Sequence, residues 1–148
     1  MIPVAIDTNV LVYAENVNGK AKRDVALQLL ARLQPEATFL PAQALAELFN
    51  VLVRKAEWTR SAAERAVVSW GDSFPIIETS SGVTLLAMTL ARDHQLGIWD
   101  AVILASAADA GCRLLLSEDL QDGFSWSGVT VANPFTSKPN PLLKRLLQ

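Results

Sequence analysis

Several residue types that mark large classes of protein are scarce in this sequence of 148 residues. The only cysteine, Cys112, cannot form an internal disulfide, which agrees with a reducing compartment and predicts a buried core thiol. The only histidine, His94, has no second histidine or cysteine at zinc-ligand spacing, and nothing pairs it with Cys112 as a cysteine protease would require. The sequence also has no glycine-rich phosphate loop. These absences exclude a disulfide-rich secreted domain, a zinc site and a P-loop enzyme.

Long apolar runs and an excess of positive charge are missing too. Hydrophobic residues make up 51% of the chain, but no apolar run approaches the ~20 residues that span a bilayer. The N-terminus lacks the basic flank and apolar stretch of a signal peptide, so we expect a cytoplasmic protein without a membrane segment. A net charge of −2 argues against a general attraction for nucleic acid, although a local basic patch is compatible with it. The high hydrophobic content predicts self-association or a hydrophobic partner.

The order of apolar segments predicts a single α/β domain. The length suffices for one continuous core. Short strand-like runs alternate with segments of helical periodicity, which predicts a mainly parallel sheet covered by helices on both faces. We expect residues 1–135 to form the domain and residues 136–148 to form a C-terminal tail with a short amphipathic turn. The expected strands are 4–6, 38–40, 75–77, 113–116 and 129–132, and the expected helices are 23–33, 41–56, 60–70, 81 to near 97, and 99–110, with loops at 16–22 and 121–128.

Two acidic residues, Asp7 and Asp119, each follow an apolar run that reads as a buried parallel strand. Ligands bind beyond the carboxyl ends of such strands, so the two carboxylates can converge although they are far apart in sequence. Thr8 and Asn9 supply polar groups that would orient a metal-binding Asp7. The alternative for Asp7 is an ordinary helix N-cap, and for the second acid an ordinary polar loop.

Two further acids, Glu47 and Asp100, lie on predicted helices. Glu47 shares a polar face with Asn50 and Arg54, which suits the wall of a cleft but also an ordinary surface cluster. Asp100 has apolar neighbours on both sides, so we expect it to be partly buried and to need a partner such as a cation. The alternative is a first-turn acid favoured by the helix dipole. Oxygen ligands at this edge of the sheet suit Mg²⁺ or Mn²⁺.

Together these segments resemble the PIN domain, the nuclease fold of VapC-type toxins of bacterial toxin–antitoxin pairs. The resemblance runs from residue 4 to about residue 134. It rests on V-A-I-D-T-N-V-L-V-Y-A, W-D-A-V-I-L-A-S-A and L-L-L-S-E-D-L, and less specifically on the mid-chain helix with one glutamate. It implies a three-layer α/β/α PIN-like fold with a small central mainly parallel sheet.

The resemblance also assigns roles to individual residues. It implies an acidic quartet that holds Mg²⁺ or Mn²⁺, made of Asp7, Glu47, Asp100 and Asp119. Asn9 and Ser117 fall on the supporting polar positions of the family. Glu118 precedes the usual position of the fourth acid, and Asp122 is another acid in the same loop, so both are alternatives to Asp119.

The function that the resemblance implies is metal-dependent hydrolysis of RNA phosphodiesters, that is, an endoribonuclease. The implied partners are RNA, a small antitoxin protein and a second copy of the chain, joined through helices early in the sequence. For RNA contacts the best candidates are Arg54 and Lys55, followed by the loop group Lys20, Lys22 and Arg23. Trp126, in a polar loop, is the one tryptophan expected to be free to stack a base.

Two other classes of function were considered. A catalytically silent PIN-fold module that binds RNA or protein would keep the architecture without turnover. A haloacid-dehalogenase-type phosphatase needs a second aspartate two residues after the first, where this sequence has Asn9.

Overall fold

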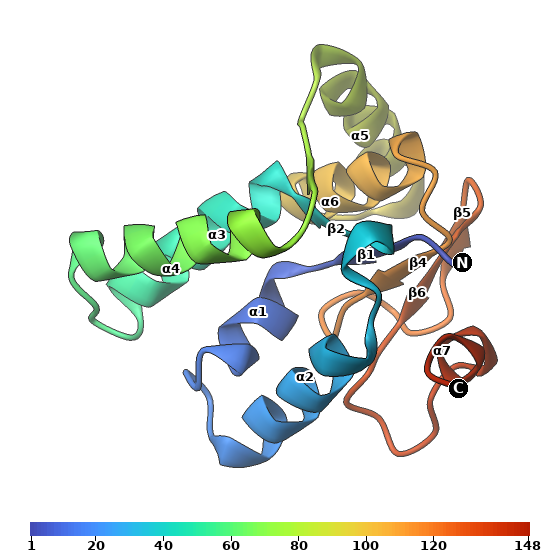
Figure 1. Cartoon of the computed structure of the whole chain (residues 1–148). Coiled ribbons are helices and arrows are strands. Elements are labelled where there is room, and N and C mark those ends of the chain that lie inside the picture. The colour runs from blue at the N-terminus through green and yellow to red at the C-terminus, as the bar shows by residue number, and fades with distance from the viewer.

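The computed structural model describes all 148 residues and places a six-stranded sheet between layers of helices (Figure 1). The strands run in the order β3-β2-β1-β4-β6-β5, and every neighbouring pair is parallel except β5 with β6. The predicted three-layer, mainly parallel α/β fold is therefore confirmed. The strands are β1 (Val4–Ile6), β2 (Thr38–Pro41), β3 (Ile76–Ile77), β4 (Leu114–Leu116), β5 (Ser125–Trp126) and β6 (Val129–Ala132).

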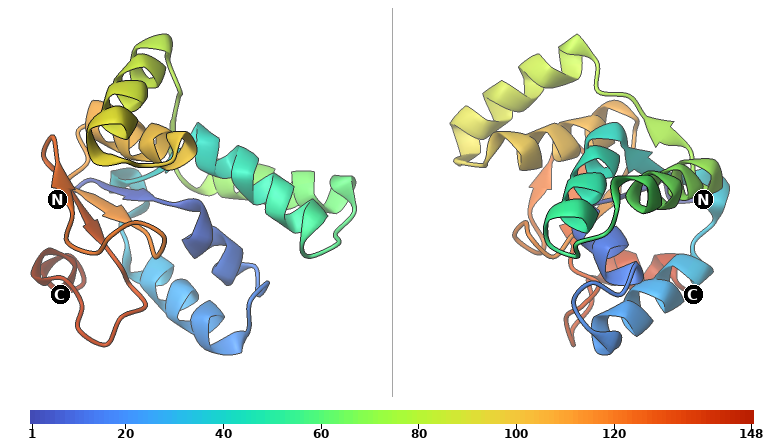
Figure 2. Two further views of the ribbon diagram at one scale, coloured as in Figure 1. Left: turned by 180° about the vertical axis from the view of Figure 1, so that it is seen from behind. Right: turned by 90° about the vertical axis from the view of Figure 1, so that its left-hand side faces the viewer.

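Seven α-helices and one short 3-10 turn, Pro35–Ala37, connect the strands. Helices α1 and α2 cover one face of the sheet and α5 and α6 the other, while α3 and α4 project sideways as an arm (Figure 2). A hydrogen bond of 2.9 Å from Trp70 Nε1 to Glu15 Oε1 links this arm to the end of α1. The helices are α1 (Thr8–Ala14), α2 (Lys20–Arg32), α3 (Ala42–Arg54), α4 (Arg60–Ser73), α5 (Ser81–His94), α6 (Ile98–Asp109) and α7 (Pro141–Leu146).

The central strands are apolar on both faces, which is why they read as continuous hydrophobic runs. In β1, Val4 and Ile6 belong to the core cluster under α1 and α2, whereas Ala5 belongs to the cluster under α5 and α6. Strand β4 repeats this alternation, with Leu115 on the α5–α6 side. Side chains of a strand point to alternate faces, so three residues contribute to two cores. This burial fixes β1 and β4 side by side, and with them the residues that follow.

Local capping sets where several helices begin and end. Thr59 accepts a hydrogen bond of 3.1 Å from Ala62 N at the start of α4, as predicted, and Ser80 does the same for α5. Gly111 follows α6 with φ of +76°, a conformation that glycine adopts at little cost, and this agrees with its predicted role after the helix. Cys112 is buried as predicted, and burial raises the pKa of its thiol to about 11.

The sequence prediction missed two elements. Residues 8–14 were not predicted to be helical, yet they form α1, which is buried along most of its length. The predicted loop 121–128 contains the short strand β5, which pairs with β6 across a turn that includes Gly128 at φ of +84°. Trp126 is part of β5 and is half-buried against the core, so the expectation that it is free to stack a base was wrong.

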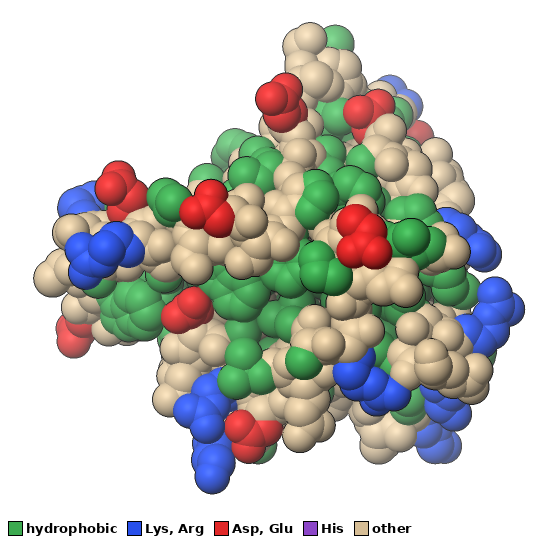
Figure 3. All heavy atoms as spheres, viewed as in Figure 1, with side chains coloured by type: hydrophobic (Ala, Val, Ile, Leu, Met, Phe, Trp, Pro, Cys, Tyr) green, Lys and Arg blue, Asp and Glu red, His purple; other side chains and the backbone are tan.

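The C-terminal segment returns to the body of the protein. Residues 136–148, predicted as a tail after the domain, include helix α7, and Leu143 is buried in the same core cluster as α2. The domain boundary at residue 135 stays a prediction. Figure 3 shows further hydrophobic side chains gathered between the arm and α1. None of the helices combines the length and the apolar character needed to cross a membrane.

Candidate active site

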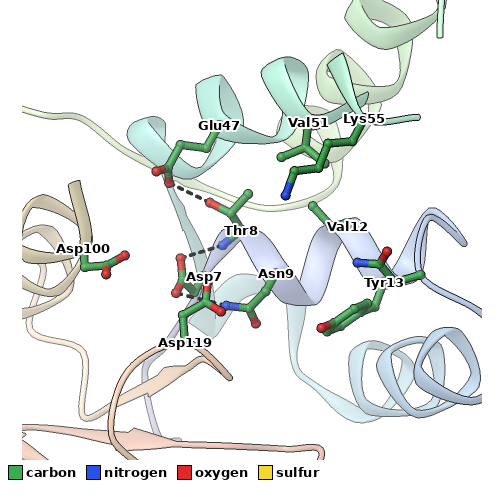
Figure 4. Close-up of a pocket in the computed structure, with 11 residues that line it drawn as sticks. Asp7, Thr8, Asn9, Val12, Tyr13, Glu47, Val51, Lys55, Asp100 and Asp119 are labelled. Atoms are coloured by element: carbon green, nitrogen blue, oxygen red, sulfur yellow. Dashed lines mark hydrogen bonds between the residues drawn. The ribbon is translucent and has the colours of Figure 1, made fainter. Parts of the chain in front are cut away.

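A cavity of about 350 Å³ opens where the carboxyl ends of β1 and β4 meet the start of α6 and the side of α3. All four of the predicted acids line it: Asp7, Glu47, Asp100 and Asp119. Their carboxylates point toward a common space, each from a different segment (Figure 4). The predicted supporting residues Thr8 and Asn9 also line the cavity, whereas Ser117 lies buried behind Asp7.

Asp7 is the most buried of these acids, with only 3% of its surface exposed. It is the N-cap of α1, because Oδ1 accepts a hydrogen bond of 2.7 Å from Thr8 N. Oδ2 accepts 2.6 Å from Ser117 Oγ and 3.2 Å from Asn9 Nδ2. Asp7 is therefore the N-cap of α1, which was the alternative considered from the sequence, and it also lines the cavity. Hydrogen bonds on both oxygens hold the carboxylate in one orientation.

Burial raises the pKa of Asp7 from its usual 3.8 to about 7. The hydrogen bonds from Ser117 and Thr8 oppose this rise, and the negative charges of Asp100 and Asp119 add to it. Without a cation in the cavity, the folded protein therefore tends to keep this carboxyl protonated. A cation bound at this carboxyl would favour its ionised form and so lower its pKa.

Glu47 is linked to Asp7 through a single residue. Thr8 donates its hydroxyl to Glu47 Oε2 at 2.8 Å while its backbone N–H donates to Asp7. Burial raises the pKa of Glu47, the Thr8 bond opposes this, and the charges of Asp100 and Asp119 add to it. The polar face of α3 predicted from the sequence therefore does line a cavity at Glu47.

Asp100 and Asp119 complete the acidic wall from α6 and from the loop after β4. The pKa of Asp100 is raised by burial and then by the nearby charge of Asp119. Asp119 is exposed, and its backbone N–H donates to Ser117 Oγ at 3.2 Å. None of the four acids takes part in any of the three ion pairs of the protein. Their mutual repulsion is thus not offset by a salt bridge.

The two alternatives to Asp119 point elsewhere. Glu118 accepts hydrogen bonds from the Tyr13 hydroxyl and, at 2.5 Å, from Lys22 Nζ. Burial alone would raise the pKa of Glu118, but these two bonds lower it below its usual value. Asp122 accepts a hydrogen bond of 3.0 Å from Asn133 N and does not line the cavity. Asp119 is the acid of this loop that faces the other three.

Of the predicted basic residues, Lys55 lines the cavity and extends toward it, whereas Arg54 donates from Nε to Asn50 Oδ1 at 3.1 Å (Figure 4). Lys22 is paired with Glu118. The sequence analysis did not single out the cavity residues Tyr13 and Asn18, which lie in or just after a helix that it did not predict. Because α1 was not predicted, the sequence did not show which of its residues face the cavity.

The side chains that line the cavity determine whether it can hold a divalent cation. In this structure no group of three or more acidic, histidine or cysteine side chains is close enough together to hold a metal ion. The chemistry of the wall nevertheless suits one, since four carboxylates, two hydroxyls and two amide side chains all offer oxygen ligands. Buried, raised-pKa carboxylates without cationic partners are also what a metal would stabilise. The donor set fits a hard cation, while its spacing here is wider than a bound ion requires.

The sequence was then compared with known proteins. The profile of the PIN domain matches residues 4–124, which is most of the chain. The chain belongs to the PIN domain family. The comparison with curated proteins found no match.

Solved structures similar to this PIN domain come from toxin–antitoxin systems. The VapC20 toxin of Mycobacterium tuberculosis, described as cleaving the sarcin–ricin loop, is 18% identical with a TM-score of 0.67, over 78% of this chain and 89% of that one. A toxin–antitoxin complex from Klebsiella pneumoniae is 21% identical with a TM-score of 0.69, over 89% and 98%. VapBC2 from Rickettsia felis, bound to a promoter DNA fragment, is 19% identical with a TM-score of 0.63, over 88% and 97%. At these identities the likeness establishes the fold.

Proposed function

We propose that this PIN-domain protein is a metal-dependent endoribonuclease and the toxin of a toxin–antitoxin pair. The observation that carries the proposal is the cavity wall, where carboxylates from four distant segments meet and none of them forms an ion pair. Such a cluster costs folding free energy through burial and repulsion, so a purely structural role is a poor explanation for it. The family match and the VapC20 neighbour support a nuclease that acts on RNA.

In the proposed site the cation would be held by Asp7, Glu47, Asp100 and Asp119. When bound, Mg²⁺ or Mn²⁺ lowers the pKa of water and stabilises negative charge on the phosphate. Thr8, Asn9 and Ser117 orient the carboxylates through the hydrogen bonds described above. In this reaction water attacks phosphorus, the P–O bond to the leaving strand breaks, a carboxylate accepts the proton that water releases, and the leaving oxygen takes up a proton from solvent. No covalent intermediate with the enzyme is required.

The proposal extends to partners and location. The similar structures include toxin–antitoxin complexes, and three of the structures contain DNA; by analogy we expect a cognate antitoxin, a homodimer and a cytoplasmic location. Exposed apolar side chains on α5, with Leu85 64% and Met88 54% exposed, are compatible with a protein partner. Lys55, on the wall of the cavity, and Arg54 beside it are the proposed phosphate contacts.

The decisive experiment is RNA cleavage with Mn²⁺ by the wild type, Asp7→Asn and Asp122→Asn. We expect Asp7→Asn to lower the rate by orders of magnitude, because it removes a charge from the cavity while keeping the size of the side chain. Asp122→Asn is the matched control, since an asparagine oxygen can still accept the bond from Asn133 N and lies off the cavity. Wild-type protein that binds RNA but cuts none with either metal would favour the alternative, a catalytically silent binding module.

A further inference from the structure

A second hollow adjoins the acidic cavity on the outer side of α3. Its volume is about 470 Å³, and it shares Glu47, Val51 and Lys55 with the first cavity. The two hollows therefore share one wall, and Asp7, Asp100 and Asp119 line only the first of them. The residues that line only the second hollow are Gln43, Ala46, Asn50 and Trp99.

Trp99 is the unusual member of this group. It directly precedes Asp100 at the start of α6, and 58% of its surface is exposed. From the sequence, only Trp126 among the tryptophans was expected to lie free of the core, so the prediction for Trp99 was wrong. Leaving the largest apolar side chain in water forgoes the free energy of burying it. An exposed tryptophan beside a proposed catalytic acid offers a flat, apolar surface on which an aromatic ligand can stack.

The opposite wall of the hollow carries unused polar groups. Asn50 accepts a hydrogen bond from Arg54 at its Oδ1, which leaves its amide nitrogen without a partner, and the side chain of Gln43 makes no hydrogen bond. Amide side chains can both donate to and accept from the edge of a base. Lys55, at the junction of the two hollows, forms no ion pair and is free to meet a phosphate.

We propose that this second hollow binds an unpaired base of the RNA, stacked on Trp99, while the phosphate next to it lies toward Lys55 and the acids. The inference rests on the proposed function, and it adds a base-binding site, built on Trp99, next to the acids. Aromatic side chains beside a basic groove are how proteins hold single strands without a strict sequence requirement. A duplex would keep its bases stacked inside and could not offer one to Trp99.

A protein partner is the other class of occupant for an exposed tryptophan. Three features favour RNA: the wall shared with the acidic cavity, the absence of an ion pair at Lys55, and a lining in which four of seven residues are polar or charged. The core of a protein–protein interface is depleted in charged residues by comparison.

The test measures binding of a labelled single-stranded RNA with Mn²⁺ present, in an Asp119→Asn background that should not cleave. We expect Trp99→Leu to weaken binding roughly tenfold (about 1.4 kcal/mol), because leucine keeps an apolar surface but has no aromatic face. Trp99→Phe should retain most of the affinity. Met88→Ala, which trims another exposed apolar side chain on α5, should have no effect. Thermal midpoints should be similar throughout, since all these side chains are exposed.

A second RNA of the same length with abasic sugars separates stacking from other effects. In the same Asp119→Asn background, proteins with Trp99 and with Trp99→Leu should bind it equally, because the base that Trp99 contacts is gone. Equal affinity of both proteins for the normal RNA, or the same loss on both RNAs, would overturn the inference and leave the nuclease proposal intact. Unchanged RNA affinity with lost self-association in Trp99→Leu would assign the hollow to a protein interface. Failure of every folded variant to bind RNA would instead overturn the proposed function.

Discussion

Ser117 Oγ donates a hydrogen bond of 2.6 Å to Asp7 Oδ2, although 110 residues separate the two in sequence. The same hydroxyl accepts from the backbone N–H of Asp119 at 3.2 Å, so one buried side chain connects two of the cavity acids. The backbone reinforces the link, because Asp7 N donates to Leu116 O at 3.0 Å. The ends of β1 and β4 are thus joined at the point where their acids meet.

Replacing this hydroxyl should loosen the site. In Ser117→Ala, Asp7 Oδ2 keeps only the longer bond from Asn9, and the buried carboxylate loses a donor. We expect the free energy of unfolding, measured in urea, to fall by about 1–3 kcal/mol. This is the cost of leaving a buried hydrogen-bond acceptor without one of its donors. Ser106→Ala is a suitable control, since its buried hydroxyl bonds only to Val102 O within its own helix. Equal, small losses in the free energy of unfolding for both variants would show that the Ser117 hydrogen bond stabilises the protein no more than an ordinary buried hydroxyl does.

The stability of the metal-free protein should fall as pH rises from about 4 to about 7. Asp7 has a folded pKa of about 7 against a usual 3.8, so in this interval the folded state holds a proton that the unfolded state has released. The bound proton stabilises the folded state fully below a pH of 3.8, and this stabilisation is lost as the pH rises through about 7. The difference between the two pKa values corresponds to at most about 4 kcal/mol. The raised pKa values of Glu47 and Asp100 act in the same direction.

Urea denaturation in chelator at about pH 5 and about pH 8 measures this effect. Asp7→Asn cannot titrate at this position and should show a much smaller decline. A decline as steep in Asp7→Asn as in the wild type would assign the pH dependence to other groups.

Divalent cations should stabilise the protein, and more so at high pH. A cation that binds the folded state alone raises the thermal midpoint by mass action, and it competes with the proton on Asp7. We therefore expect a larger Mn²⁺-induced shift at about pH 8 than at about pH 6, by differential scanning fluorimetry after chelator treatment. Asp100→Asn should reduce the shift, while Asp109→Asn, at the other end of the same helix, should not. An unchanged midpoint in saturating Mn²⁺ would count against a metal site.

Neighbouring acids in the loop after β4 should differ in their roles. Asp119→Asn changes an acid that lines the cavity and should lower RNA cleavage strongly. Glu118→Gln changes an acid bonded to Tyr13 and Lys22, so cleavage should persist while the thermal midpoint falls slightly. The comparison is made with a labelled RNA at matched protein concentration. Loss of cleavage in Glu118→Gln with full activity in Asp119→Asn would reverse the assignment.

Lys55 should contribute to RNA affinity through charge. In the Asp119→Asn background, Lys55→Ala should weaken binding and lower the slope of log affinity against log salt by roughly 0.7, the value for one phosphate contact on a single strand. Arg54→Ala tests the second proposed contact in the same way. Lys144→Ala removes an exposed charge on α7 and should leave the slope unchanged. The same slope for all four proteins would remove both residues from the binding surface.

The sequence alone carried the information for the sheet and for the acids. Strands such as Val4–Ile6 are buried on both faces, and this forces an uninterrupted apolar run that is visible without coordinates. Asp7 and Asp119 were found because each lies just after such a run, Asp100 because apolar residues flank it, and Glu47 because it lies on the polar face of a predicted helix. Caps such as Thr59 were predictable because the capping bond is made within three residues.

Other features were decided by contacts between distant segments. Helix α1 was missed because Val10, Leu11, Val12 and Tyr13 are all buried, so no polar face marks the helical period. Strand β5 exists because β6 pairs with it, which its own two residues do not encode.

The roles of neighbouring residues were decided in the same way. Glu118 and Asp119 are adjacent and chemically alike, and only the position of Lys22 and Tyr13 turns the first away from the cavity. Trp99 is exposed and Trp126 packs against the core, which is the reverse of what was expected from the sequence. The packing of α6 and the pairing of β5 decide which of the two indoles is covered. Local sequence determines which groups are present and which elements they follow, whereas the direction each side chain faces depends on partners that only the folded chain brings near.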